Sequence, residues 1–249
     1  MHARPSSASV ILTSQRLACD NIWQDHCHEI GASSSGRSFV QDSMNFNGED
    51  QWVEARPRGQ VGGAGGLSIV ARVRRSSEGG PAWDRLIDYG NGAEKENIVI
   101  NFQQEMMYEV RGPDGRCHSL AVRASETSGH ASSSSQDVKP GTWCAESEFP
   151  RNEWVHISLV HDSDGVASIF WDGRLKARGP VQLPSRVHRD NYYVGKSHWT
   201  HDPYFKGEIS ELHVFDYALS RGEITQCATA RCLPTGALAA LSEHSPSPF

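Results

Sequence analysis

The sequence predicts an all-β protein made of antiparallel strands. From Ser38 to about Phe215, short runs of β-branched and aromatic residues alternate with Gly, Asn, Asp and Pro, and helical periodicity is nearly absent. Seven Trp, six Tyr and eight Phe can fill a core although only 37% of the residues are hydrophobic. We expect one domain over residues 38–232, because all-β sandwiches routinely use roughly 200 to 250 residues as a single unit.

The first strands are expected where apolar residues alternate with polar ones. Residues 67–73 place Leu67, Ile69, Ala71 and Val73 on one face, which predicts a core strand. Four more runs, at 85–89, 97–102, 106–111 and 117–123, read as a meander, and the last two are joined by the turn sequence Gly-Pro-Asp-Gly at 112–115. The Ser-rich stretch 124–137 is expected to be a mobile surface loop.

The clearest local signal is the segment from Trp154 to Leu175. Val155, Ile157 and Leu159 alternate with polar residues, and Asp-Gly pairs at 164–165 and 172–173 favour tight reversals of the chain. The segment therefore predicts three consecutive antiparallel strands.

The end of the chain predicts a bulged strand and a short helix. In residues 208–215 the inward positions shift from Ile209 to Leu212, which predicts a bulge near residues 210–211. Ser220 and Glu223 fit a capping box that starts a helix through about Gln226. Residues 1–37 are expected to be a loosely structured lead-in and residues 233–249 a disordered tail.

Composition excludes several classes of partner. The net charge of −6 comes from 24 basic and 30 acidic residues without long runs, which argues against nucleic acid. No segment approaches the roughly 18 apolar residues of a membrane span, so membrane insertion is not expected, and residues 8–12 are too short for a signal peptide.

The cysteines could form disulfides, and a pair of histidines could bind a metal ion. Six cysteines would allow up to three disulfides. If the chain is oxidised, a disulfide between Cys117 and Cys144 would clamp the Ser-rich loop that they flank; if it is reduced, both are small core residues. There is no CxxC pair of the kind found in zinc ribbons. His26 and His28 have no second ligand pair, so solvated histidines are the preferred interpretation.

Six fragments occur in an order that resembles a known family. They are Met44-Asn-Phe-Asn-Gly, Asn152-Glu-Trp-Val-His-Ile, Ile169-Phe-Trp-Asp-Gly, Tyr193-Val-Gly-Lys-Ser, Phe205-Lys-Gly and Phe215-Asp-Tyr-Ala-Leu-Ser. Together they resemble the laminin G-like and concanavalin A-like lectin-glucanase domains, pentraxin relatives included. The resemblance implies a two-sheet antiparallel jelly-roll sandwich, here followed by a short C-terminal helix.

The resemblance also implies a function. Such domains usually bind glycans or proteins through a concave face or rim loops, and are often parts of secreted or cell-surface proteins, which favours an extracellular or secretory location. Many hold a rim calcium, but Ser210 stands where the family pattern has an Asp. Asp42 and Glu211 are then the candidate calcium ligands, because calcium prefers carboxylate oxygens.

The candidate contact residues lie mainly in the loop before the last strand. Trp199, His201, Asp202 and Tyr204 combine aromatic faces with polar groups, whereas Phe205 is expected to seal the core. A zinc or copper site at His198 and His201 lacks further ligands apart from Asp202, so these histidines are read as solvated.

A second candidate contact is Trp83 with Asp84. The alternative, in which Trp83 folds back onto the core, is equally consistent with the sequence.

These observations predict a non-catalytic binding module for carbohydrate or glycoprotein. One alternative is a protein-interaction or adhesion domain of a larger protein. A glycoside hydrolase or polysaccharide lyase is less favoured, because the family-like pattern Glu-x-Asp-x-x-Glu is absent and the acidic clusters at 146–148 and 208–211 do not complete it.

Overall fold

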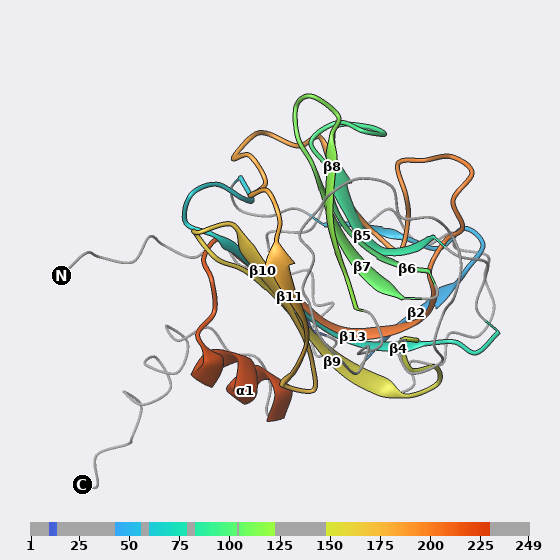
Figure 1. The fold of residues 1–249 in the computed structure, drawn as a ribbon. Helices are drawn as coiled ribbons and strands as arrows, with labels where there is room; N and C mark the ends of the chain where they lie inside the picture. The colour runs from blue at the N-terminus through green and yellow to red at the C-terminus, as the bar shows by residue number, and fades with distance from the viewer. Residues whose placement is uncertain are drawn as a thin grey trace, which may run out of the picture.

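The computed structural model describes residues 43–55, 60–78, 83–103, 105–122 and 148–229, together with the backbone of residues 10–13. Two antiparallel sheets pack face to face, and one helix follows the last strand (Figure 1). This is the predicted two-sheet jelly-roll sandwich with a short C-terminal helix.

The six-stranded sheet contains the predicted meander. Its spatial order is β3, β12, β5, β6, β7, β8. The strands are β3 (Val53–Glu54), β12 (Asn191–Val194), β5 (Asp84–Gly90), β6 (Ile98–Phe102), β7 (Met106–Arg111) and β8 (Cys117–Ala121). All four strands of the predicted meander are present, and consecutive ones pair antiparallel.

The seven-stranded sheet contains the predicted hairpins and the bulged last strand. Its order is β1, β13, β4, β9, β10, β11, and β2 also pairs with β13. The strands are β1 (Val10–Thr13), β2 (Met44–Asn47), β4 (Leu67–Arg75), β9 (Trp154–His161), β10 (Val166–Trp171), β11 (Arg174–Pro180) and β13 (Lys206–Phe215). Asp172 and Gly173 both have positive φ, as a tight turn with right-handed strand twist requires. The register of β13 on β4 shifts between Ile209 and Glu211, which confirms the predicted bulge.

The core lies between the two sheets. Inward residues of β4, β9 and β13 meet those of β5, β6 and β7, and rings from both sheets interlock at one end, where Phe102 and Phe149 lie 4.6 Å apart. Arg75 is fully buried nearby and makes two hydrogen bonds to the carboxylate of Asp84, at 3.1 and 2.6 Å. Pairing both charges inside the core avoids the cost of burying either one alone.

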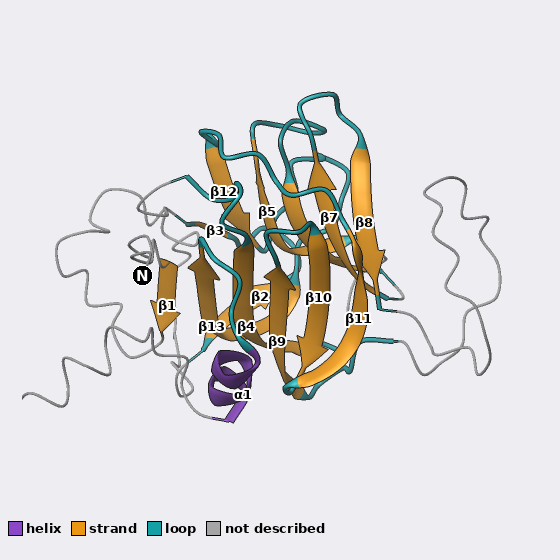
Figure 2. Ribbon diagram, turned by 60° about the vertical axis from the view of Figure 1, so that its left-hand side comes forward, coloured by secondary structure: helices purple, strands orange, loops and turns teal. Residues whose placement is uncertain are grey.

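The helix covers part of the outer face of the seven-stranded sheet. Helix α1 (Arg221–Thr229) lies beside β9 and β13 in Figure 2, and its Ile224 packs in a second buried cluster with Val70 and Phe215. The capping box forms as predicted, since Ser220 N donates to Glu223 Oε2 (2.8 Å) and Glu223 N donates to Ser220 Oγ (3.4 Å). The helix ends at Thr229, one turn later than predicted. No described helix is long and apolar enough to cross a membrane.

Two expectations about the ends and the cysteines change. The lead-in contains β1, whose residue Val10 pairs with Val214, so this segment extends the sheet. Cys117 is a free thiol, which contradicts the predicted clamp with Cys144. Cys144, the Ser-rich loop and the predicted tail lie outside the described residues.

Candidate polar site on the outer face of the six-stranded sheet

Strands β5, β6 and β7 place polar side chains on the outer face of the six-stranded sheet, with a bulge between Arg85 and Ile87 on β5. In one row across the strands Arg85 lies opposite Asn101, and Asn101 opposite Met107. In the next row Asp88 lies opposite Val99, and Val99 opposite Glu109. Their neighbours on each strand point into the core, as the two-residue period of a strand requires. These outer side chains are nevertheless buried or nearly so, so other groups cover this face.

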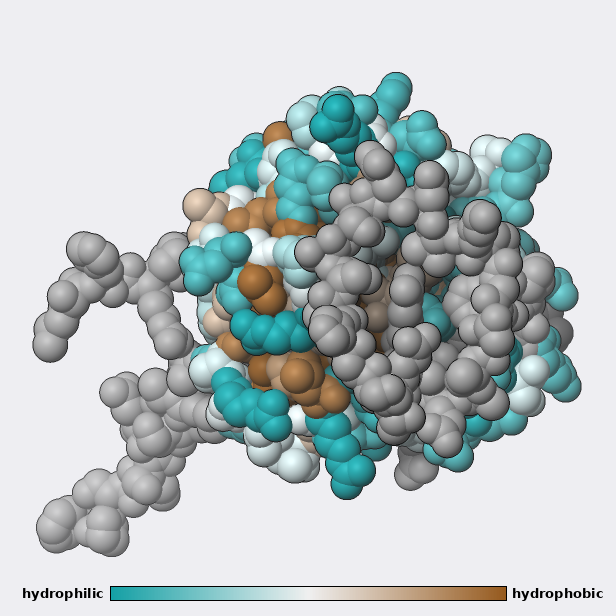
Figure 3. Space-filling view, viewed as in Figure 1, coloured by the Kyte–Doolittle hydropathy of each residue, from teal (hydrophilic) through white to brown (hydrophobic). Residues whose placement is uncertain are grey.

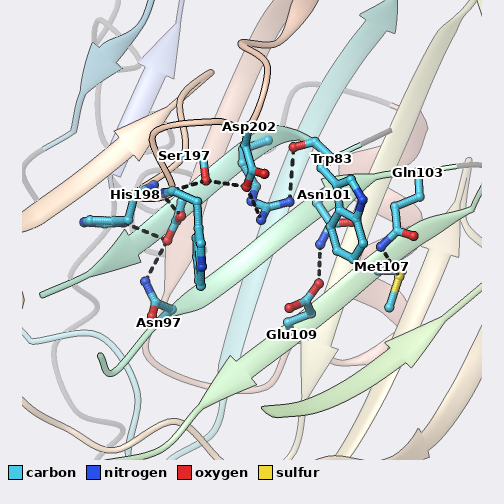
Figure 4. Close-up of polar contacts among 12 residues, drawn as sticks. Trp83, Asn97, Asn101, Gln103, Met107, Glu109, Ser197, His198 and Asp202 are labelled. Carbon is cyan, nitrogen blue, oxygen red and sulfur yellow. Dashed lines mark hydrogen bonds and ion pairs between the residues drawn. The ribbon is translucent and has the colours of Figure 1, made fainter. Parts of the chain in front are cut away.

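The cover includes the loop of residues 195–205, which runs from β12 to β13 across the face (Figure 4). The carboxylate of Asp202 fixes this loop, because its Oδ2 accepts from Arg85 Nη2 (2.7 Å) and from Ser197 Oγ (2.8 Å). The backbone N–H of His198 donates to Asp88 Oδ2 (2.9 Å), and its ring Nδ1 lies 2.9 Å from Asp88 Oδ1. Two carboxylate contacts therefore hold the loop on the sheet.

Two indole rings flank the guanidinium group of Arg85. Its Cζ lies 5.6 Å from the ring centroid of Trp83 and 5.4 Å from that of Trp199, and Arg111 contacts Trp199 at 5.1 Å. Distances below about 6 Å correspond to cation–π attraction. Trp83 remains 43% exposed. Both rings thus contact a charged group that Asp202 neutralises.

A second polar pair lies beside the rings. Asn101 Nδ2 donates to Glu109 Oε1 (2.5 Å), and Cys117 Sγ donates to Glu109 Oε2 (3.5 Å). Burial, with the nearby charge of Glu109, raises the pKa of the Cys117 thiol to about 11, so the sulfur stays protonated at neutral pH. Asn101 Oδ1 and Arg85 Nε have no hydrogen-bond partner. Unsatisfied polar atoms in a folded protein mark positions where water or a ligand can bind.

Three of the sequence-predicted contact residues come together here. Trp83, Trp199 and Asp202 all surround Arg85. His201 is exposed, Tyr204 is half-buried, and Phe205 is fully buried as predicted.

Asp84 is the exception among these residues. It points into the sandwich toward Arg75, because neighbouring residues of a strand face opposite sides. Burial raises the pKa of Asp84 although Arg75 acts against this. The side chain that faces the site is therefore that of Arg85, two residues after Trp83.

The predicted calcium ligands are not brought to this site. Glu211 lies on β13 of the other sheet, where its Oε2 is 4.0 Å from His213 Nε2. Asp42, His26 and His28 lie outside the described residues. Within the described ranges no three His, Cys, Asp or Glu side chains are grouped as a metal ion would require. Calcium binding therefore stays a prediction from the sequence.

The sequence interpretation missed the polar residues that underlie the rings. Arg85, Asn101 and Glu109 are the outward positions of three strands that were predicted with nearly correct boundaries. The sequence does carry a signal for these residues, because each is a charged or amide side chain at an outward position of a strand whose neighbouring residues are apolar. The pairing of these strands, which sets the three side chains in adjacent rows, needed the structure.

Comparison with known proteins places the chain in a family. Residues 47–225, well over half of the sequence, match a laminin G-type family model described as the concanavalin A-like lectin/glucanases superfamily. The chain belongs to this superfamily. A search of curated proteins found no match.

Solved structures with the same fold share little sequence with this superfamily member. Domain 4 of AbnA, an extracellular arabinanase of Geobacillus stearothermophilus solved in complex with arabinotriose, is 16% identical with a TM-score of 0.50, over 88% of this chain and 87% of that one. The binding domain of botulinum neurotoxin serotype G is 14% identical with a TM-score of 0.53, over 75% and 42%. A mutant of NanB sialidase from Streptococcus pneumoniae is 15% identical with a TM-score of 0.51, over 73% and 27%.

The chain thus spans less than half of the toxin and sialidase chains. At these identities the likeness shows the fold alone.

Proposed function

We propose that this domain binds carbohydrate, free or on a glycoprotein, on the outer face of the six-stranded sheet, where Trp83 and Trp199 supply the stacking rings. The observation that carries the proposal is the pair of indole rings that both contact Arg85. Indole faces stack on the apolar faces of sugar rings, and neighbouring polar groups satisfy the hydroxyls. Asn101 Oδ1 and Arg85 Nε are buried without a protein partner, and bridging waters between them and a ligand can satisfy them.

The backbone of Trp83 supports a functional role. Its φ is +87°, a conformation that bulky residues rarely adopt and that costs of order 1–3 kcal/mol. Trp83 and Leu175 are also the exposed large hydrophobic residues in the described part of the chain. Hydrophilic groups cover most of the described surface in Figure 3, with hydrophobic residues in small patches. An exposed indole held in a strained conformation is more readily explained by ligand contact than by packing.

The similar arabinanase domain was solved with arabinotriose, and the similar toxin domain is a binding domain. Both are compatible with a glycan ligand here. The sialidase and the arabinanase are enzymes, which makes catalysis the first alternative.

The arrangement of carboxylates favours binding over hydrolysis. A retaining glycosidase needs one carboxyl group that donates a proton and a second that attacks, about 5 Å apart. The carboxylates of Asp88, Glu109 and Asp202 each accept hydrogen bonds from Asn, Arg, Ser, Cys or backbone donors. All three carboxylates are thus used in contacts that hold the covering loop and the strands in place.

A glycan array followed by calorimetry on the bound sugars tests the proposal. We expect Trp83→Ala and Trp199→Ala each to weaken binding roughly tenfold, which is about 1.4 kcal/mol. Leu175→Ala is the matched control, because Leu175 is 48% exposed but lies on β11 of the other sheet.

The outcomes separate the alternatives. If no glycan binds, and pull-down recovers a protein partner that Trp83→Ala loses, the domain is a protein-interaction module. Release of sugar from a polysaccharide panel, lost in Glu109→Gln, would establish an enzyme instead.

A further inference from the structure

A second aromatic surface lies on the same outer face, at the β3 and β12 edge. The rings of Trp52 and Tyr193 are 5.0 Å apart and nearly perpendicular, and both side chains are half-buried. Lys196 Nζ lies 4.1 Å from the Trp52 ring centroid and 4.7 Å from that of Tyr193. This cluster, named here the Trp52 cluster, consists of Trp52, Tyr193 and Lys196.

Sheet register places the Trp52 cluster on the face that carries the first site. Glu54 lies opposite Tyr193, and Tyr193 opposite Asp88, which belongs to the same row as Glu109. Trp52 is two residues before Glu54 and therefore points to the same side of the sheet.

Aromatic surface connects the two positions. The ring of Tyr193 lies 4.5 Å from that of His198, and His198 is followed directly by Trp199. The Trp52 cluster begins on β3, and Trp83 and Trp199 lie against Arg85 of β5, two strand spacings away, which is about 10 Å across the sheet. One sugar ring cannot cover this distance, whereas a chain of several rings can.

The charges on this face favour an uncharged ligand. Arg85 is paired with Asp202 at 2.7 Å, and Arg111 lies 3.7 Å from Glu94 and 3.8 Å from Glu109. Lys196 is the third cation of the described face, and the carboxylates of Glu54 and Asp88 lie in the row beside it. Carboxylates therefore outnumber cations among the described residues, and an acidic sugar would meet like charge.

We propose that the ligand is an uncharged, linear oligosaccharide that stacks on Trp83 and Trp199 at one position and on the Trp52 cluster at a second. This inference rests on the proposed function, which by itself requires only the first position. It assigns a ligand class and a second contact surface to the same face.

Calorimetry with sugars of increasing length tests the inference. The probes are the mono-, tri- and pentasaccharides of the arabinan, xylan and cellulose series. Within a series that binds, affinity is expected to rise at least tenfold from the monosaccharide to the pentasaccharide. Trp52→Ala should remove this gain and leave the affinity for the monosaccharide within twofold.

Two controls make the test specific. Trp154→Ala removes a Trp that lies on β9 of the other sheet, and should change neither affinity. Trigalacturonic acid and its methyl ester have the same sugar backbone and differ in charge. We expect the affinity for the acid to be no higher than the affinity for the ester. Circular dichroism and thermal melting of Trp52→Ala show that the variant is folded, and Trp52→Phe should keep part of the gain.

The results distinguish this inference from the proposed function. Three results would contradict the inference and leave the first position intact. They are an affinity that does not depend on chain length, a gain in affinity with chain length that survives Trp52→Ala, and tighter binding of trigalacturonic acid than of its methyl ester. If the wild-type domain binds none of the glycans, both the inference and the proposed function are contradicted.

Discussion

Two buried histidines should make this domain sensitive to mild acid. His156 on β9 and His213 on β13 lie on the outer face of the seven-stranded sheet and are 3% and 1% exposed. Their ring nitrogens have no hydrogen-bond partner. Burial lowers the pKa of His156 to about 4, with Arg72 adding to the effect and Asp172 opposing it. Burial likewise lowers the pKa of His213 to about 4, with His156 adding to it.

The sign and size of the effect follow from linkage. The folded pKa lies below the unfolded value of about 6.5, so between pH 7 and pH 5 the unfolded chain binds protons that the folded chain does not. The free energy of unfolding therefore falls as the pH falls. At pH 5 the loss is roughly 2 kcal/mol for each histidine and about 4 kcal/mol for the pair. Domains are typically stable by only about 5–15 kcal/mol.

A third histidine acts in the same direction. His161 Nδ1 lies 3.0 Å from the hydroxyl of Tyr108, and its Nε2 lies 2.9 Å from the carbonyl oxygen of Val181. Because the carbonyl can only accept, Nε2 carries the proton and Nδ1 accepts from Tyr108. Burial lowers the pKa of His161, and after protonation Nδ1 would have to donate to the Tyr108 hydroxyl instead of accepting from it. Asp84 acts in the opposite sense because burial raises its pKa, so the measurement should stop at pH 5, above the usual aspartate range.

Urea unfolding at pH 7.5, 6.0 and 5.0, followed by Trp fluorescence, measures the effect. His156→Leu and His213→Leu should each reduce the loss of stability between pH 7.5 and pH 5.0 by roughly 2 kcal/mol. His188→Gln is the control, because the His188 side chain is 81% exposed. A wild-type loss below about 1 kcal/mol, or variants that keep the full loss, would show that these histidines are not buried in the neutral form.

Three further predictions follow from particular contacts. Arg189 is 1% exposed and donates to three backbone carbonyl oxygens at 2.7, 2.7 and 3.1 Å. Arg189→Met should therefore lower the free energy of unfolding in urea by at least about 3 kcal/mol, and a decrease below about 1 kcal/mol would contradict this role. Trp83→Gly removes both the indole and the backbone strain, so glycan binding should weaken while the melting temperature stays the same or rises. A lower melting temperature would show that Trp83 is needed for packing. Because Glu211 lies on the other sheet, EDTA should leave glycan affinity unchanged; a loss of affinity that added calcium restores would place a calcium ion in the binding site.

Local sequence patterns predicted the strands better than they predicted the site. The Asp-Gly turns, the bulge at residue 210 and the capping box at Ser220 are each decided by residues close in sequence, and all three appear as expected. Strand β1 was missed because three apolar residues and a threonine in a Ser-rich segment carry no visible period, and the strand that they pair with lies about 200 residues away.

Part of the candidate site was visible in the sequence. Trp199 and Asp202 were found from the composition of one loop, but their shared partner Arg85 lies 117 residues from Asp202 in sequence. Asp84, which the sequence analysis named together with Trp83, is paired with the buried Arg75 inside the sandwich, and Arg85 faces the site. Long-range pairing of this kind is not visible in a single sequence.

The most direct test of glycan binding on the six-stranded sheet is NMR of the Trp indole N–H groups during titration with a sugar that binds. Assignment by single Trp→Phe variants identifies each signal. The signals of Trp83 and Trp199 should shift in proportion to occupancy, and that of Trp154, on the other sheet, should stay in place. Shifts confined to Trp154, or saturable binding that moves neither Trp83 nor Trp199, would place the binding site elsewhere and contradict the account.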